Sequence, residues 1–300
     1  MNIKFVSLCL GAGLFALPGN IQATIQPVPI IGGHYAAGVE GIKGASLPPP
    51  GLYFRDYNIG YFADQFADGP PNFDISAYIN APRLIWITPY KILGADYGMD
   101  LIIPFGYMDW GYDTPGGPDG GSYFGIGDIQ IAPLLLSWHF KQFDLAFGYA
   151  VWAPSGDYSP SRPDFIAKGY WSHMLTLGGT WYIDQEKTWA VSLLNRYEFA
   201  HEQEQTHTDP GQVYTLEWGI SKSLSKTVDI GLIGYYQQQT TKDSGQWASK
   251  LRDRIVGIGA EINMFCPKIG MFTSIRYAGE FNAVQRPEGQ LLAVTLTKPL

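Results

Sequence analysis

The stretch Tyr170-Trp-Ser-His-Met-Leu-Thr-Leu-Gly-Gly-Thr-Trp-Tyr-Ile183 alternates in character from one residue to the next. One parity carries the apolar side chains, Trp171, Leu175, Leu177, Trp181 and Ile183. The other carries Ser172, Thr176, Gly178, Thr180 and Tyr182. A strand that crosses a bilayer needs about nine to eleven tilted residues and favours aromatic rings at both headgroup levels. The stretch therefore predicts one strand of a transmembrane β-barrel.

The composition of the whole chain agrees with a barrel. The 300 residues are 15% aromatic and only 16% charged, with 36 glycines and 21 prolines. The 46% hydrophobic fraction forms no second long apolar run after the N-terminus, so no spanning helix is expected. The formal net charge of -7 argues against a nucleic-acid partner, which would require basic patches.

The N-terminus reads as a secretory signal over residues 1–23. Lys4 supplies the positive region, residues 5–17 are apolar, and Pro18 and Gly19 precede a small residue at Ala23. Cys9 leaves with the signal, so the mature chain is expected to keep one cysteine, Cys266, and no intramolecular disulfide.

A glycine- and proline-rich segment, residues 24–51, follows the signal and ends in Pro48-Pro49-Pro50-Gly51. Its apolar residues do not recur at any sustained period. Two interpretations stay open: a periplasmic leader, or a segment that folds back into the barrel as a partial plug, as larger barrels often have.

Residues 52–300 are predicted to form the barrel, an all-β, antiparallel, up-and-down transmembrane structure of about twelve strands. The alternating segments are roughly 52–62, 74–87, 94–107, 124–139, 143–152, 170–183, 188–201, 212–223, 228–239, 255–264, 270–278 and 290–298. Long and short connections alternate between them. Short periplasmic turns and long outer loops on an even number of strands are typical of outer-membrane barrels.

Tryptophans and prolines refine this prediction. Trp86, Trp138, Trp181 and Trp189 lie beside short turns, and Trp152 and Trp171 are expected at the opposite rim. The apolar parity slips at Ala132-Pro133 and again at Ala81-Pro82, so a β-bulge or a break in strand pairing is predicted at both sites.

Charged strand residues are expected to face the lumen, because an Arg or Lys at the bilayer midplane costs about 2–4 kcal/mol. The predicted lumen-lining residues are Asp128, Arg196, Glu198, Glu217, Glu261 and Arg276. Three aspartates that follow short turns are expected to ring the periplasmic mouth: Asp96, Asp144 and Asp229. Their roles stay open between an ionic network that holds the lumen together and a selectivity role.

Apolar side chains also fall on the inward parity. They are Phe54, Ile102, Met174, Tyr182, Leu194, Ile233 and Tyr235. A mixed apolar and charged interior suits a passage for small apolar or aromatic molecules better than an open ion pore, and simple filling of the interior is the alternative.

Catalysis and metal binding have weak signals. Ser137 and His139 share a strand face, but no third member of a hydrolase triad is evident in the sequence. His201 and His207 would lie about 20 Å apart on an extended strand, so no metal site is expected. No catalytic residue, cofactor or metal is predicted.

Several motifs resemble the outer-membrane proteins of the phenol meta-cleavage (MetA-type) degradation pathway. They are His34-Tyr35 through PPPGLY at 48–53, GIGDIQIAPLLLSW at 125–138, APSGDY at 153–158, GQVYTLEWGISKSL at 211–224, GLIGYYQQQTTKDSG at 231–245 and GQLLAVTLTKPL at 289–300. The resemblance implies a barrel that passes hydrophobic substrates during the degradation of aromatic compounds.

The expected function is a channel of the Gram-negative outer membrane that passively admits small hydrophobic or aromatic compounds. The alternatives are a non-transporting structural or surface-interaction barrel and an outer-membrane lipid hydrolase. The expected partners are outer-membrane lipid, lipopolysaccharide, the barrel-assembly machinery and small hydrophobic or aromatic solutes. We expect the barrel to work as a monomer.

Overall fold

The computed structural model describes residues 32–160, 162 and 166–300. The predicted signal, 1–23, and the first part of the following segment, 24–31, lie outside the described residues. Among the described residues no helix has the length and apolar character needed to cross a membrane.

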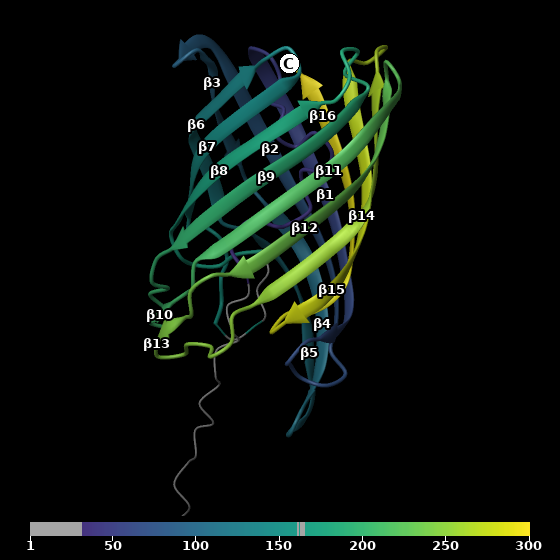
Figure 1. Ribbon diagram of the computed structural model, residues 1–300. Coiled ribbons are helices and arrows are strands. Elements are labelled where there is room, and N and C mark those ends of the chain that lie inside the picture. Colours follow the sequence, from purple (N-terminus) through teal and green to yellow (C-terminus); the bar gives the residue numbers. More distant parts are fainter. Residues whose placement is uncertain (1–31, 161, 163–165) are drawn as a thin grey trace, which may run out of the picture.

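The strands form one large antiparallel sheet that closes on itself (Figure 1). β1 pairs with β2 along one edge and with β16 along the other, which completes the ring. The strands of this sheet are β1 (Gly51–Phe66), β2 (Asp74–Ile92), β3 (Ala95–Ile102), β4 (Phe105–Thr114), β5 (Gly117–Ile126), β6 (Ile129–His139), β7 (Phe143–Ala153), β8 (Ser172–Tyr182), β9 (Trp189–Ala200), β11 (Val213–Ser225), β12 (Val228–Gln239), β14 (Arg254–Cys266), β15 (Met271–Val284) and β16 (Pro287–Pro299).

Two pairs of these elements are halves of longer strands. β3 and β4 both pair with β2 and are separated only by Ile103 and Pro104. β5 and β6 pair with β4 and β3 and are separated by Gly127 and Asp128. Counted this way, the barrel has twelve spanning strands. The predicted fold class is confirmed, and each predicted segment overlaps one spanning strand.

The connections also follow the prediction. Short turns gather at the end where β16 finishes, and the longer connections gather at the opposite end (Figure 1). Two of the outer loops are joined by the small strands β10 (Thr208–Asp209) and β13 (Ser244–Gly245). The glycine-rich connection after β4 differs from the expected loop, because its backbone pairs as a β-hairpin as far as Thr114 and Gly117.

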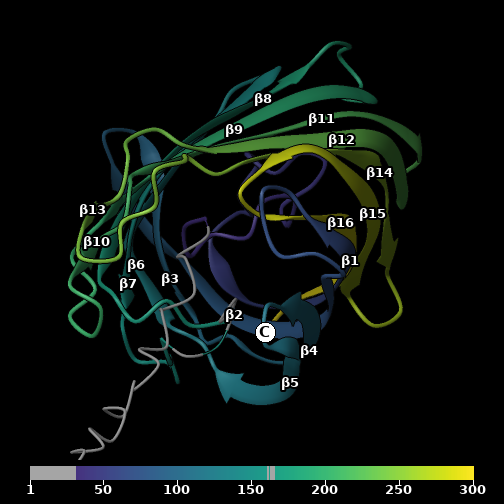
Figure 2. The same cartoon turned by 90° about the horizontal axis from the view of Figure 1, so that it is seen from below.

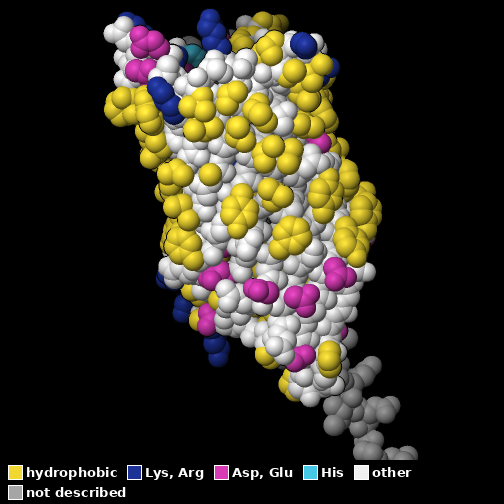
Figure 3. Space-filling view, turned by 90° about the vertical axis from the view of Figure 1, so that its right-hand side faces the viewer, with side chains coloured by type: hydrophobic (Ala, Val, Ile, Leu, Met, Phe, Trp, Pro, Cys, Tyr) yellow, Lys and Arg dark blue, Asp and Glu magenta, His cyan; other side chains and the backbone are white. Residues whose placement is uncertain are grey.

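The outer surface of the wall is apolar. The predicted lipid-facing residues Trp171, directly before β8, and Leu177 and Trp181 on β8 are 52%, 53% and 52% exposed. Ser172 and Thr180 on the other parity are fully buried. A wide apolar region covers the face seen in Figure 3, with basic side chains at the short-turn end and a row of acidic ones toward the loop end. Such a region matches the hydrocarbon-facing band of a membrane barrel.

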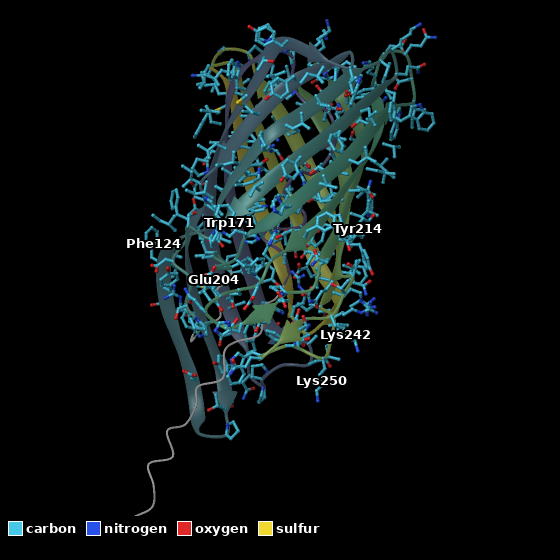
Figure 4. The ribbon with its side chains drawn as sticks, turned by 90° about the vertical axis from the view of Figure 1, so that its left-hand side faces the viewer. Phe124, Trp171, Glu204, Tyr214, Lys242 and Lys250 are labelled. Atoms are coloured by element: carbon cyan, nitrogen blue, oxygen red, sulfur yellow. The ribbon has the colours of Figure 1, made fainter. Side chains whose placement is uncertain are left out.

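Aromatic side chains mark both borders of this region. Trp86, Trp181 and Trp189 are exposed near the short turns. Phe124 and Trp171 are exposed toward the loop end, above the charged loop residue Glu204 in Figure 4. Trp152 lies at this rim as expected, at the loop end of β7, but it is 7% exposed and its ring stacks on His34 inside the barrel, so it is not part of the lipid-facing girdle.

The bulge predicted at Pro133 is confirmed. The ladder between β6 and β7 passes directly from Ile131 to Leu134, and the ladder between β3 and β6 shifts at the same level. Pro133 has no N–H to donate, so the interruption costs little pairing.

The prediction at Pro82 is only partly right. Pro82 pairs in register with Asp56 on β1, and the inward parity of β2 is unbroken, so there is no bulge. The ladder is interrupted only on the other side, where β4 gives way to β3. The alternation in the sequence suggested a slip because Ile75, which is apolar, faces the interior, where it packs with other apolar side chains at the loop end.

Candidate functional site in the barrel lumen

The chain before β1 runs through the inside of the barrel (Figure 2). At the loop end, the Gly32 N–H donates to Asp253 Oδ2 at 2.8 Å. At the short-turn end, the Ser46 hydroxyl donates to Asp144 Oδ2 at 2.7 Å. Residues 32–50, called the inner segment below, therefore extend along most of the lumen.

Three wall glutamates accept the backbone N–H groups of the inner segment. Glu198 on β9 accepts from His34 at 3.0 Å. Glu217 on β11 accepts from Gly38 and Glu40, each at 3.1 Å, and Glu261 on β14 accepts from a residue farther along. Because the segment has no strand partner, its buried N–H groups need acceptors, and these carboxylates supply them.

Small residues let the inner segment approach the wall this closely. A β-carbon on Gly38 would lie 2.6 Å from the Tyr235 ring, and Gly38 has a φ of +86°. A β-carbon on Gly33 would overlap the Glu198 carboxylate. Glycine is the residue that tolerates both conditions, which explains the glycine-rich composition before β1.

The carboxylate of Glu40 lies among three wall arginines. Its Oε1 accepts from Arg83 at 3.1 Å and from Arg196 at 3.4 Å, and its Oε2 accepts from Arg55 at 3.0 Å. The Tyr57 hydroxyl also donates to Oε1, at 3.1 Å. One carboxylate of the inner segment thus joins strands β1, β2 and β9.

The wall arginines have further partners. Arg83 also donates to Asp100, with the Nε to Oδ2 distance at 3.0 Å. The Arg196 guanidinium stacks on the Tyr35 ring, 3.9 Å from its centroid, and lies 3.9 Å from Glu217. These contacts fix the side chains at one level of the barrel.

His34 occupies a second polar cluster nearer the loops. Its ring nitrogens lie 2.7 Å from Glu198 and 3.2 Å from Asp128, and its ring stacks on Trp152. Asp128 also accepts backbone N–H groups of the β7–β8 loop, including that of Lys168 at 2.6 Å. The break between β5 and β6 therefore places a carboxylate where it ties the outer loop to the inner segment.

All six residues predicted to line the lumen are buried and take part in polar contacts inside the barrel. They are Asp128, Arg196, Glu198, Glu217, Glu261 and Arg276. Arg276 on β15 lies 3.6 Å from Glu261 and donates to Ser274. Most of these contacts reach the inner segment or a neighbouring strand instead of open solvent.

The three aspartates expected at the periplasmic mouth lie at the short-turn end. Asp144 accepts from Ser46, and Asp229 lies 2.7 Å from Lys43, so both hold the inner segment. Asp96 pairs with Lys91 on the adjacent strand at 2.6 Å.

Sequence reasoning missed part of this site. Arg55 and Asp100 were not singled out, and Glu40 and His34 were not expected to meet wall residues. Phe54 was expected inside, but it is 40% exposed on the outer face and Arg55 takes the inward position. The charge of Arg55 beside apolar Phe54 was the signal that could have corrected this parity.

A cavity of about 410 Å³ lies between the inner segment and the wall. Its lining extends from Trp152 and Ile166 toward the loops to Pro48 and Tyr53 toward the short turns. Arg55, Arg83 and Arg196 also line it. Its apolar and aromatic wall is formed mainly by Tyr57, Ile59, Ile85, Leu135, Ala150 and Met174.

The structure supplies the third member that the sequence did not reveal for Ser137 and His139. The Ser137 hydroxyl lies 3.4 Å from His139 Nε2, and His139 Nδ1 lies 3.1 Å from Asp144 Oδ1. However, Ser137 is only 1% exposed. A nucleophile needs room for a carbonyl carbon beside it, so this arrangement lacks access for a substrate.

The family model described as "Putative MetA-pathway of phenol degradation" matches residues 56–296. The chain belongs to this family. The match covers almost the whole barrel, from β1 to β16. No curated protein matches the chain.

Solved structures share the fold of this member of the phenol-degradation family. An outer membrane channel from Pseudomonas putida F1 is 14% identical, with a TM-score of 0.74, and the alignment covers 85% of this chain and 97% of that one. The β domain of the Bordetella autotransporter BrkA is 12% identical, with a TM-score of 0.50, over 83% of this chain and 99% of that one. The closed barrel and its apolar outer band place this family member in the outer membrane.

Proposed function

We propose that the chain is an outer-membrane channel that passively admits small hydrophobic or aromatic compounds. The observation that carries this proposal is the 410 Å³ cavity beside the inner segment. Its volume is in the range of about 300–1,000 Å³ that is usual for small-molecule sites.

The lining favours cargo with an apolar part over bulk water and inorganic ions. Tyrosines and aliphatic side chains make up much of the cavity wall. Charged groups also line it, and several of them are paired with one another, as Lys43 is with Asp229 and Arg83 with Glu40. Twelve strands also give a narrower barrel than the sixteen to eighteen that enclose an open aqueous channel. The cavity extends toward both ends of the lumen, as a diffusion path requires.

The family description supports an aromatic cargo related to phenol. Passive entry needs no other energy source, since the solute gradient alone drives diffusion. The proposal includes a monomeric barrel, inserted by the barrel-assembly machinery and surrounded by lipid and lipopolysaccharide.

The rival is a barrel that does not transport, in which the inner segment acts as a structural core. The hydrogen bonds from the segment to three wall glutamates favour this rival. The cavity favours transport, because a purely structural filling would be expected to close it.

A reconstitution experiment separates these two functions. Proteoliposomes that contain the full-length chain are loaded with a dye sensitive to phenol, and the rate of phenol entry is compared with the rate into protein-free liposomes. The entry of glucose into the same two kinds of vesicle is measured separately. We expect faster phenol entry and no change for glucose. Equal phenol rates with and without protein would remove the transport proposal and leave the structural role.

A further inference from the structure

Glu40 is held in the way that a bound carboxylate would be. Its two oxygens accept from the guanidinium groups of Arg55, Arg83 and Arg196, and its side chain is 7% exposed. Guanidinium groups form charge-assisted hydrogen bonds with carboxylates, and these are stronger than neutral ones. We call the three arginines, together with the Tyr57 hydroxyl, the arginine site.

The arginine site is short of negative charge without Glu40. If Glu40 moved away, Arg83 would still be paired with Asp100, and Arg196 would still lie 3.9 Å from Glu217. Within the part of the chain that the structure describes, Glu40 is the carboxylate that pairs with Arg55. Arg55 also lies directly opposite Arg83 across the β1–β2 ladder, where like charges destabilise the pair unless an anion joins them.

The arginine site opens on the apolar cavity. All three arginines line the cavity, beside Tyr57, Ile85 and Met174. Arg55 is the most accessible of them, with 25% of its side chain exposed. An apolar pocket with a few convergent polar groups is the usual form of a small-molecule site.

We propose that the arginine site binds the carboxylate of small aromatic acids, and that Glu40 occupies it as an internal substitute in the structure described here. The inference rests on the proposed channel function and names its substrate class. An aromatic acid that enters the cavity replaces the Glu40 carboxylate and places its ring against the apolar wall. The inner segment then loses its central attachment to β1, β2 and β9.

The chemistry selects acids over neutral aromatics. A neutral ring can use the apolar wall but cannot replace a carboxylate among three guanidinium groups, because burying these cations without a partner is costly. A small anion without a ring can use the arginines but gains nothing from the wall. The site should therefore prefer a molecule that has both parts.

The test measures binding to the full-length chain in detergent by isothermal titration calorimetry. The Glu40→Gln variant keeps the shape of the side chain and removes its charge, so benzoate should bind it at least about tenfold more tightly than the wild type. Benzyl alcohol and acetate serve as probes that each lack one of the two parts. Glu202→Gln, which alters a carboxylate in an outer loop, is the matched control and should behave as the wild type.

A double variant assigns the binding to the arginine site. Adding Arg55→Gln to Glu40→Gln should return benzoate affinity to the wild-type value or below. Retention of heat-modifiable mobility on a gel verifies folding of each variant. If Glu40→Gln does not fold, Glu40→Asp provides the test, because its shorter carboxylate releases part of the contact and should still raise benzoate affinity.

The outcomes divide clearly. Benzoate affinity that is the same in wild type, Glu40→Gln and Glu40→Asp overturns the inference, as does equal binding of benzoate and acetate. Both results leave the phenol-entry experiment untouched. Tight benzoate binding without phenol entry would instead support the arginine site and refute the channel.

Discussion

Gly41 of the inner segment lies against Glu261 of β14 so closely that a β-carbon on Gly41 would overlap the carboxylate. The next residue, Ile42, donates its N–H to Glu261 Oε2 at 2.7 Å. Gly41 also has a φ of +70°. Both the space and the backbone conformation at this point require glycine.

The Gly41→Ala variant should therefore loosen the inner segment. The left-handed conformation alone costs a non-glycine residue about 1–2 kcal/mol, and the overlap with Glu261 adds to it. We expect faster cleavage of the segment by an added protease and a lower thermal unfolding midpoint. Gly279→Ala is the control, since a β-carbon there meets no atom within 4 Å. Equal protease sensitivity of the two variants would contradict this account.

Filling the cavity should block solute entry. Ala150 on β7 faces the cavity and is 4% exposed, and a tryptophan there would occupy the passage. We expect Ala150→Trp to reduce phenol entry into proteoliposomes severalfold. Val151→Trp, on the lipid-facing parity of the same strand, is the matched control and should transport normally. Unchanged entry through folded Ala150→Trp would show that solutes do not pass by this route.

The Ser137–His139–Asp144 arrangement should be structural. Because Ser137 is buried, a fluorophosphonate probe should not label it in the folded chain. We expect Ser137→Ala to leave phenol entry unchanged and to lower stability by about 1 kcal/mol, through the loss of one hydrogen bond. Labelling that is present in the wild type and absent in Ser137→Ala would revive the lipid hydrolase.

Asp184 in the turn between β8 and β9 provides a pH test. Hydrogen bonds from the Thr188 side chain and from the Trp189 backbone lower the pKa of Asp184 from 3.8 to about 2. A depressed folded-state pKa means that the stabilising contribution is present above pH 4 and is lost as the pH falls toward 2.

The Asp184→Asn variant should consequently unfold faster than the wild type in denaturing detergent at neutral pH. The difference should shrink between pH 4 and pH 2, where the wild-type carboxylate takes up its proton. Glu186→Gln in the same turn serves as the control and should show no such difference. A gap between Asp184→Asn and wild type that persists unchanged at pH 2 would refute the role of the carboxylate.

The orientation of the barrel can be read from Cys266. This free thiol is exposed at the short-turn end, which we assign to the periplasm. A membrane-impermeant maleimide should label it only after the outer membrane is permeabilised. Glu204→Cys in a Cys266→Ser background should be labelled in intact cells, because Glu204 lies in an outer loop (Figure 4). The reverse pattern would invert the assigned topology.

Several features of the fold followed from local sequence alone. The two-residue alternation around Leu177 predicts a lipid-facing strand because each side chain must face either hydrocarbon or the interior. The same reasoning correctly identified the bulge at Pro133. It assigned Phe54 and Trp152 to the wrong face of their strands, because an aromatic ring is compatible with either hydrocarbon or the interior. The face of an aromatic residue therefore has to be inferred from a neighbour whose orientation is certain.

The sequence by itself determined the barrel, its number of strands, its short and long connections and the family, because these depend on patterns within each strand and its neighbours. Only the tertiary structure decided that Glu40 meets Arg55, Arg83 and Arg196, and that Glu198, Glu217 and Glu261 accept hydrogen bonds from the inner segment. These partners lie far apart in the chain, on strands that become adjacent only when the sheet closes. No local period encodes such contacts, since they depend on where an irregular segment finds acceptors for its backbone inside a closed wall.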